Sequence, residues 1–315
     1  MHKGWHVGVV IPAKDEELFI GGVLETLPTI VDSVVVVDDG SSDGTSKVAG
    51  NYLNQTYNLR IIRLEGKGVG AAIDAGHMEM LKSCPKPFVS VVMAGDGQMD
   101  PKDMCEIITP IVEERCDYVK GNRFIHAEGL GNMPTIRRFA SQILAFLTTL
   151  ASGIPVNDPQ CGYTATNHQV LEKWNWSKSW SKYGYPNYWL IELSKLSFEV
   201  MEVPVKSIYG EEKSNLKMLR FLFSVGIMMF IMLHKRCLTM LFNRNVVPHS
   251  LFSLVAYSIG WIAIIPSIST DLEREIANST SGIIFLVCIS WTAAHVFDRM
   301  AVKTRIELRK NAQAR

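Results

Sequence analysis

Residues 34–45 read VVVVDDGSSDGT, a β-branched apolar run of strand length that ends in an acidic turn rich in glycine and serine. Four further apolar runs of strand length lie at 7–11, 59–62, 88–93 and 118–119. The stretches between them have the length and composition of helices, at 16–27, 43–57, 69–81 and 101–114. Strands that alternate with such helices predict βαβ crossovers, and therefore an α/β fold with a doubly wound, mostly parallel sheet.

Polar residues follow three of the predicted strands, at the place where open parallel sheets bind their ligands. These segments are 12–17, 38–45 and 93–101. A helix N-cap accounts for part of the role of Asp43, but capping explains the adjacent Asp38 and Asp39 less well. Acidic groups that converge on one edge repel each other unless a cation or a hydrogen-bonding ligand lies there. The sequence therefore predicts a ligand site at this edge.

Charge and motif content exclude several other functions. The chain has 32 Lys+Arg against 31 Asp+Glu, a balance that excludes a generally basic nucleic-acid binder. Gly66, Gly68 and Gly70 come nearest to a dinucleotide fingerprint, but they lack its spacing and follow the third strand instead of the first. No Walker A sequence occurs, and the six cysteines show neither a CxxC pair nor metal-ligand spacing.

The C-terminal third is more apolar than the rest and predicts membrane contact. Residues 246–270 and 276–297 contain no Asp, Glu, Lys or Arg, and at about 1.5 Å per residue each reaches roughly 33 Å or more, enough to cross a bilayer core of about 30 Å. A buried core helix is the alternative for each run. The 13-residue apolar run 221–233 is short for a span and has basic residues at both ends, which favours an interfacial helix. The alternative, a third crossing, would invert the topology.

Charge asymmetry predicts the orientation of these helices. Basic residues precede the first predicted span and dominate the tail after the second, whereas the loop between the spans is acidic. The positive-inside rule therefore places the N-terminal body and the tail in the cytoplasm. The expected organisation is a cytoplasmic catalytic domain over 1–215, interfacial helices over 216–244, two transmembrane helices over 245–298 and a basic tail over 299–315.

Seven blocks, in order along residues 6–217, carry a specific resemblance. They read VVIPAKDEE, VVVVDDGSSDGT, EGKGVGAAIDAG, VVMAGDGQMDP, KGNRF, NDPQCGYTA and VPVKSIYGEEKSNLK. In this order they resemble the inverting family 2 glycosyltransferases with the Rossmann-like GT-A fold. Within that family they are most similar to the polyprenyl-phosphate sugar transferases, the dolichyl-phosphate mannose and glucose synthases among them.

The resemblance implies roles for individual residues. It places Asp96 and Gln98 on Mg²⁺ or Mn²⁺ beneath the donor diphosphate, and it implies catalytic roles for Asp96, Arg123 and Asp158. The residues implied to bind the nucleotide-sugar are Pro12, Lys14, Glu16, Asp38, Asp39, Lys67, Ala94, Gly95 and Asp96. Those implied to bind the acceptor phosphate are Arg123, Arg137, Arg138, Gln160, Lys213, Ser214 and Lys217.

Three departures from the family pattern affect this interpretation. Ala94 stands where the family usually has the first aspartate of Asp-x-Asp, so we expect weak metal binding without nucleotide. Lys14 and Asp15 replace the usual Tyr-Asn. The arginine that the mannose-type enzymes carry before their Ser-Lys signature is missing, and the choice among Lys206, Lys213 and Lys217 as its substitute stays open.

The resemblance implies transfer of a hexose from a UDP- or GDP-sugar to polyprenyl or dolichyl phosphate at the cytoplasmic membrane face. Such an acceptor is already anionic near pH 7, so it needs no strong general base. A second hypothesis passes the sugar to a lipid-linked saccharide or a lipid hydroxyl. A third, which Ala94 favours, is a membrane scaffold on a decayed transferase. The sugar, the base and the oligomeric state, including a homo-oligomer, stay open.

Overall fold

The computed structural model describes residues 1–53, 57–126, 135–181, 184–206, 208, 218–240, 246–265 and 280–313. A seven-stranded sheet forms its centre, in the order β3-β2-β1-β4-β6-β5-β7. The strands are β1 His6–Ala13, β2 Ser33–Asp38, β3 Asn58–Arg63, β4 Phe88–Val92, β5 Tyr118–Asn122, β6 Thr164–Asn167 and β7 Val200–Pro204. All neighbours pair in parallel except β6, which is antiparallel to both β4 and β5.

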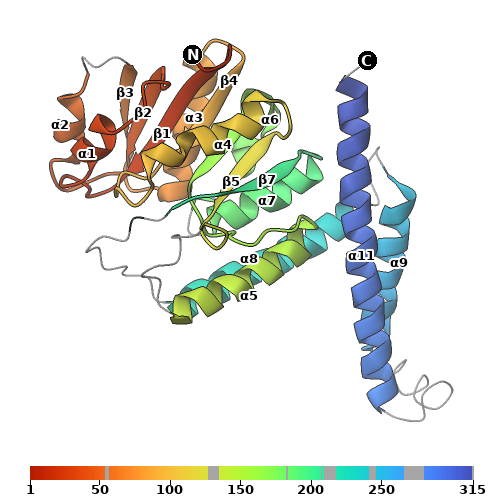
Figure 1. Ribbon diagram of the computed structural model, residues 1–315. Coiled ribbons are helices and arrows are strands. Elements are labelled where there is room, and N and C mark those ends of the chain that lie inside the picture. Colours follow the sequence, from red (N-terminus) through yellow and green to blue (C-terminus); the bar gives the residue numbers. More distant parts are fainter. Residues whose placement is uncertain are drawn as a thin grey trace.

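Helices cover both faces of this sheet, and further helices extend from it (Figure 1). The elements of the α/β body are α1 Ile20–Glu25, α2 Thr45–Gly50, α3 Val69–Ser83, the short 3₁₀ helix η1 Pro101–Asp103, α4 Met104–Val112, α6 His168–Lys173, the 3₁₀ helix η2 Trp176–Lys178 and α7 Tyr185–Lys195. The longer helices outside it are α5 Thr135–Ser152, α8 Met218–Met240, α9 Pro248–Ile262 and α11 Thr280–Gln313. One apolar core lies between the sheet and α1, α2 and α4. The second lies under α3, α5, α6, α7 and α8 and holds much of the aromatic cluster of residues 174–189.

The predicted doubly wound α/β sheet is confirmed, and all five predicted strands are present. Two predicted helices are much shorter than expected, since 16–27 reduces to α1 and 43–57 reduces to α2. The reason for the first is tertiary. The backbone N–H of Asp15 donates to Ser41 Oγ at 2.9 Å and that of Glu16 donates to Thr45 Oγ1 at 2.8 Å, so this backbone is held by the loop after β2 and not by a helical turn.

Two of the described helices are long and apolar enough, by length and composition, to cross a membrane, over Phe221–Thr239 and Gly282–Gln313. The first lies in α8 and contains the run predicted to be interfacial. The first predicted span, 246–270, is described only to residue 265 and contains α9, whose 15 residues measure about 22 Å. α9 and α11 pair side by side, with Ser253 Oγ donating to the Ala294 carbonyl at 2.8 Å. Figure 1 shows this pair running crosswise to α5 and α8.

The C-terminal half of α11 docks on the α/β body. Arg309 forms an ion pair with Asp117, and its Nε donates to the Ser197 carbonyl at 2.9 Å. Lys310 donates to the Arg115 carbonyl at 3.0 Å. Basic residues of the predicted tail are therefore helical through residue 313 and contact the domain that carries the sheet.

Candidate active site

The C-terminal ends of β1, β2 and β4 meet at one edge of the sheet, as the sequence predicts. Ala13 lies opposite Asp38 in the β1–β2 register, and the Asp39 N–H donates to the Ala13 carbonyl at 2.9 Å. The Gly95 N–H donates to the Pro12 carbonyl at 3.1 Å. Backbone contacts therefore bring the segments after three strands into one cluster, which we call the strand-end cluster: residues 12–17, 38–45 and 94–98.

Asp38 organises the turn that follows β2. Its side chain is fully buried and accepts hydrogen bonds from the Ser41 N–H at 2.7 Å and from the Ser46 hydroxyl. Burial would raise the pKa of Asp38, but the hydrogen bonds from Ser41 and Ser46, together with Arg63, outweigh it and hold the pKa below its usual range. Asp38 is therefore an ionised anchor for its own loop, and its predicted contact with a nucleotide-sugar stays a prediction.

Asp39 ties the glycine-rich segment after β3 to the strand-end cluster. One carboxylate oxygen accepts the Lys67 N–H and the other the Gly68 N–H, each at 2.7 Å. The ammonium group of Lys14 lies 3.8 Å from the position that a Cβ on Gly66 would occupy. Two lysines predicted to bind the donor, Lys14 and Lys67, therefore flank the same loop, which the sequence alone could not connect to Asp39.

The loop 66–68 can lie close to the turn after β2 only because residue 40 is a glycine. Replacing Gly40 with alanine tests this contact. Gly40 has φ +74°, and a Cβ there would lie 2.8 Å from the backbone nitrogen of Gly66. We expect Gly40→Ala to cost about 1–3 kcal/mol of stability and to raise KM for the nucleotide-sugar, because the two loops must separate. Chemical denaturation and donor titration measure these effects.

Gly66→Ala is the matched control, because Gly66 also has positive φ, +71°, but a Cβ there meets nothing closer than 3.8 Å. It carries the backbone strain without the collision. Equal KM values for the two variants would contradict the proposed loop contact.

The turn after β4 carries the predicted metal ligands. Asp96 Oδ1 accepts the Gln98 N–H at 3.0 Å, and the Gln98 carbonyl accepts the N–H of Ile208 at 3.0 Å. Within the described ranges no group of three or more His, Cys, Asp or Glu side chains could hold a metal. Asp96 and Gln98 offer hard oxygen atoms, which suit Mg²⁺ or Mn²⁺ once phosphate oxygens complete the coordination shell. The residues therefore fit a cation that binds together with a diphosphate.

Arg123 and Asp158 form a buried bidentate pair at the end of β5. Arg123 Nε and Nη2 donate to the two oxygens of Asp158 at 2.7 and 2.8 Å, and the Arg123 N–H adds a third bond at 3.0 Å. Burial would raise the pKa of Asp158, but the hydrogen bonds and charge of Arg123 hold it low. Asp158 is thus ionised and fixes the plane of the Arg123 guanidinium.

A supporting layer holds this pair, and sequence reasoning missed it. Glu202 of β7 accepts the N–H groups of Asn157 and Asp158 at 2.9 and 3.0 Å and also the side-chain amide of Asn122 at 3.0 Å. Lys120 is fully buried and donates to the Cys161 carbonyl at 2.5 Å, and burial lowers its pKa. The available signal for Lys120 was its position as the first residue of the block KGNRF, directly after the apolar residues Tyr118 and Val119, whereas Glu202 has no local signal.

The predicted acceptor residues are only partly described. Gln160 Nε2 donates to Asn187 Oδ1 at 2.7 Å, and Asn187 Nδ2 donates to Thr148 Oγ1 at 2.7 Å, which links the loop to α7 and α5. Arg138 lies in the first turn of α5 and is partly buried. Arg137 has a helical position, but its side chain lies outside the described atoms, as do residues 213, 214 and 217 altogether. The roles of Arg137, Lys213, Ser214 and Lys217 remain predictions.

Asp74 of α3 is a buried carboxyl that the sequence did not single out. Tyr185 donates to Asp74 Oδ1 at 2.6 Å, but burial raises the pKa of Asp74 to about 6. Because the pKa of Asp74 is raised in the folded protein, the stability that this group contributes is present below pH 4 and is lost as the pH rises through 6.

We therefore expect Asp74→Asn, which keeps an acceptor for Tyr185, to stabilise the protein by about 1–3 kcal/mol at pH 7.5 and by little at pH 4. Unfolding curves at both pH values test this, and an equal gain at both would contradict it.

A family model and two curated relatives all relate this chain to glycosyltransferases. A family model described as "Glycosyl transferase family 2" matches residues 8–174. A UDP-N-acetylglucosamine–dolichyl-phosphate N-acetylglucosaminyltransferase of Methanococcus voltae is 30% identical over 217 residues, covering 64% of this chain and 86% of the relative. A polyprenol monophosphomannose synthase of Mycolicibacterium smegmatis is 30% identical over 207 residues, covering 62% and 75%.

Solved structures support the fold. Glucosyl-3-phosphoglycerate synthase of Mycobacterium tuberculosis, solved with Mn²⁺, UDP-glucose and phosphoglyceric acid, superposes with a TM-score of 0.54 at 19% identity, over 74% of this chain and 80% of the other. At that identity the likeness shows a shared GT-A-like architecture. The extent of the family match and the identity to the curated relatives show that the chain belongs to glycosyl transferase family 2 and is related to the polyprenyl-phosphate sugar transferases.

Proposed function

We propose that the protein is an inverting hexosyltransferase that moves a sugar from a UDP- or GDP-sugar to polyprenyl or dolichyl phosphate at the cytoplasmic face of a membrane. The observation that carries the proposal is the strand-end cluster, in which Asp39 and the Asp96–Gln98 turn lie at one edge of the sheet and Asp39 holds the loop 66–68 beside them. Relatives named for sugar transfer to dolichyl phosphate and polyprenol monophosphate support the acceptor class.

On the donor side, Pro12, Lys14, Glu16, Asp39 and Lys67 surround the nucleotide. Asp96 and Gln98 would hold Mg²⁺ or Mn²⁺, and such a cation would neutralise charge on the leaving diphosphate. Mn²⁺ or Mg²⁺ accompanies UDP in crystals of the mycobacterial structural relative, which supports this assignment.

On the acceptor side, the phosphate monoester brings its own negative oxygen as nucleophile. The Arg123 guanidinium, oriented by Asp158, attracts this phosphate, and the further basic residues of the predicted acceptor set add to the attraction. One in-line displacement forms the bond from the phosphate oxygen to the anomeric carbon, breaks the bond to the diphosphate and inverts the configuration.

The helices outside the α/β body supply the membrane side of the proposal. α5 and α8 lie along the cytoplasmic surface, and the α9–α11 pair, crosswise to them in Figure 1, crosses the bilayer. The catalytic domain is 1–215, the interfacial region 216–244, the membrane region 245–298 and the tail 299–315. The excess of basic residues in the flanking segments supports a cytoplasmic domain and tail.

A donor screen tests the function. Membranes that contain the protein are incubated with labelled UDP-glucose, GDP-mannose or UDP-N-acetylglucosamine, with a polyprenyl phosphate and Mg²⁺ or Mn²⁺. A lipid product that has one phosphate and is labile to mild acid is the expected result. A base-stable glycoside without that lability would support transfer to a hydroxyl instead, and no transfer from any donor would favour the scaffold.

A further inference from the structure

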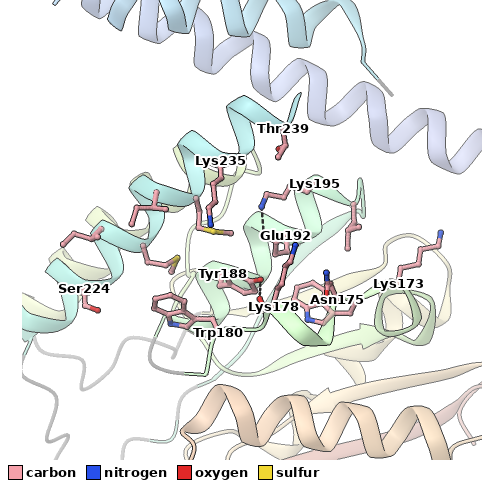
Figure 2. A pocket seen from close by; sticks show the side chains of 16 residues that line it. Lys173, Asn175, Lys178, Trp180, Tyr188, Glu192, Lys195, Ser224, Lys235 and Thr239 are labelled. Carbon is pink, nitrogen blue, oxygen red and sulfur yellow. Dashed lines mark hydrogen bonds and ion pairs between the residues drawn. The ribbon is translucent and has the colours of Figure 1, made fainter. Parts of the chain in front are cut away.

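A long groove lies between α7 and α8, outside the strand-end cluster (Figure 2). Its volume is about 1000 Å³, and segment 173–180 closes one side. The α8 wall consists of residues spaced three and four apart, which places them on one helix face: Ser224, Ile227, Met228, Ile231, Met232, Lys235 and Thr239. No residue of the strand-end cluster lines this groove.

The middle of the groove is apolar and open to solvent. Met228 and Met232 are buried in its floor, whereas Ile227 and Ile231 are 45% and 49% exposed. Trp180 and Tyr188 stack on the opposite side with ring centroids 6.5 Å apart. Side chains of this kind, in a channel open along a helix, suit a flexible hydrocarbon chain better than a compact polar ligand.

The groove also has a positive rim. Its lining includes four lysines and a single glutamate. Lys195 is paired with that glutamate, Glu192, at 2.6 Å. Figure 2 shows the side chains of Lys178, Lys195 and Lys235 directed into the groove from three different elements. The net charge around the apolar channel is therefore positive, which complements an anionic group attached to an apolar chain.

We propose that this groove binds a phospholipid of the surrounding bilayer that has an anionic headgroup. Its phosphate lies among Lys178, Lys195 and Lys235, and one acyl chain lies along Ile227 and Ile231. The inference rests on the proposed placement of α8 at the membrane surface, where lysines attract anionic lipids. Of the predicted acceptor residues with described side chains, Arg123, Arg138 and Gln160, none lines the groove, so we place this lipid apart from the acceptor phosphate.

Native mass spectrometry of the delipidated full-length protein in mild detergent tests the proposal. The probes are dioleoylphosphatidylglycerol, dioleoylphosphatidylcholine and a polyprenyl monophosphate. We expect one phosphatidylglycerol adduct, preferred over phosphatidylcholine by about tenfold. Lys178→Glu with Lys235→Glu removes the preference, whereas Lys178→Arg with Lys235→Arg keeps it. Lys47→Glu with Lys82→Glu, which makes the same charge change on exposed lysines of α2 and α3, also keeps it.

Three results would overturn the proposal. They are equal binding of the two phospholipids, an undiminished preference in the Lys178→Glu/Lys235→Glu protein, and displacement of phosphatidylglycerol by an equal concentration of polyprenyl phosphate. Sugar transfer is measured on the same preparations, so the two claims fail separately. A lysine-dependent phosphatidylglycerol preference without transfer would refute the proposed function and support the lipid groove.

Discussion

Asp96→Ala is expected to lower kcat/KM for sugar transfer by about 100-fold or more. Asp96 lies in the turn after β4, and Ala94 stands where the family usually has a second carboxylate that could take over. Removing a group that stabilises charge in the transition state costs about 10²–10³ in rate. Steady-state transfer assays over a range of Mn²⁺ concentrations measure the loss, with circular dichroism to confirm that the variant is folded.

Two further variants make this result specific. Asp100→Asn changes an acid of the same loop that caps η1 through the Lys102 N–H at 3.0 Å, and we expect activity within about threefold of the wild type. Ala94→Asp restores the usual family carboxylate and should tighten Mn²⁺ binding in the absence of nucleotide. Retention of more than a tenth of the activity by Asp96→Ala at saturating Mn²⁺ would refute the metal role of Asp96.

The centre of the sheet could be predicted because β1, β2 and β4 are buried on both faces and therefore read as unbroken apolar runs such as Val34–Val37. β6, with the sequence TATN, has no such run, and its antiparallel direction depends on pairing with β4 and β5. The late start of α1 was equally hidden. It results from hydrogen bonds to Ser41 and Thr45, which lie 26 and 29 residues away from their partners.

In the candidate site too, some residues could be predicted from the local sequence and others could not. Residues directly after strands, such as Asp39 and Asp96, could be predicted from position and residue type. Glu202 could not, because it supports Asn157 and Asp158 from a strand 45 and 44 residues away, and an acid in a strand resembles an ordinary exposed position. Local pattern identifies groups at the sheet edge, whereas the residues that orient them depend on chain segments that meet only in the fold.

The C-terminal end of α8 could not be predicted from the local sequence pattern. The apolar run 221–233 ends before Lys235 and Arg236, and charges normally mark the end of a buried segment. In the structure the helix continues to Met240, and Arg236 is only 1% exposed. Its partner is Asp298 of α11, with Nη1 to Oδ1 at 3.0 Å and Nη2 to Oδ2 at 2.5 Å. The Arg236–Asp298 pair therefore joins the helix proposed to lie on the membrane to the helix proposed to cross it.

Removing one partner of this buried pair should be costly. Asp298→Ala leaves the Arg236 charge buried beside Arg305, which is itself 5% exposed, and we expect a loss of about 3–5 kcal/mol. Gly153 packs against the pair, since a Cβ there would lie 2.6 Å from Asp298 Oδ2, so little room exists for water to replace the carboxylate. The midpoint of thermal unfolding in mild detergent should fall by about 5–8 °C, because a chain of 315 residues has a large entropy of unfolding.

The double variant separates the charge effect from the packing effect. Arg236→Leu with Asp298→Leu removes both charges and fills part of the same space, so it should recover most of the lost stability, because apolar replacement of a buried pair is often neutral. Glu113→Ala is the surface control: it breaks the exposed Lys3–Glu113 pair, with side chains 55% and 41% exposed, and should cost less than about 1 kcal/mol. If the double variant were as unstable as Asp298→Ala alone, the pair would stabilise the helix junction by specific attraction, and the expected penalty for a lone buried charge would be wrong.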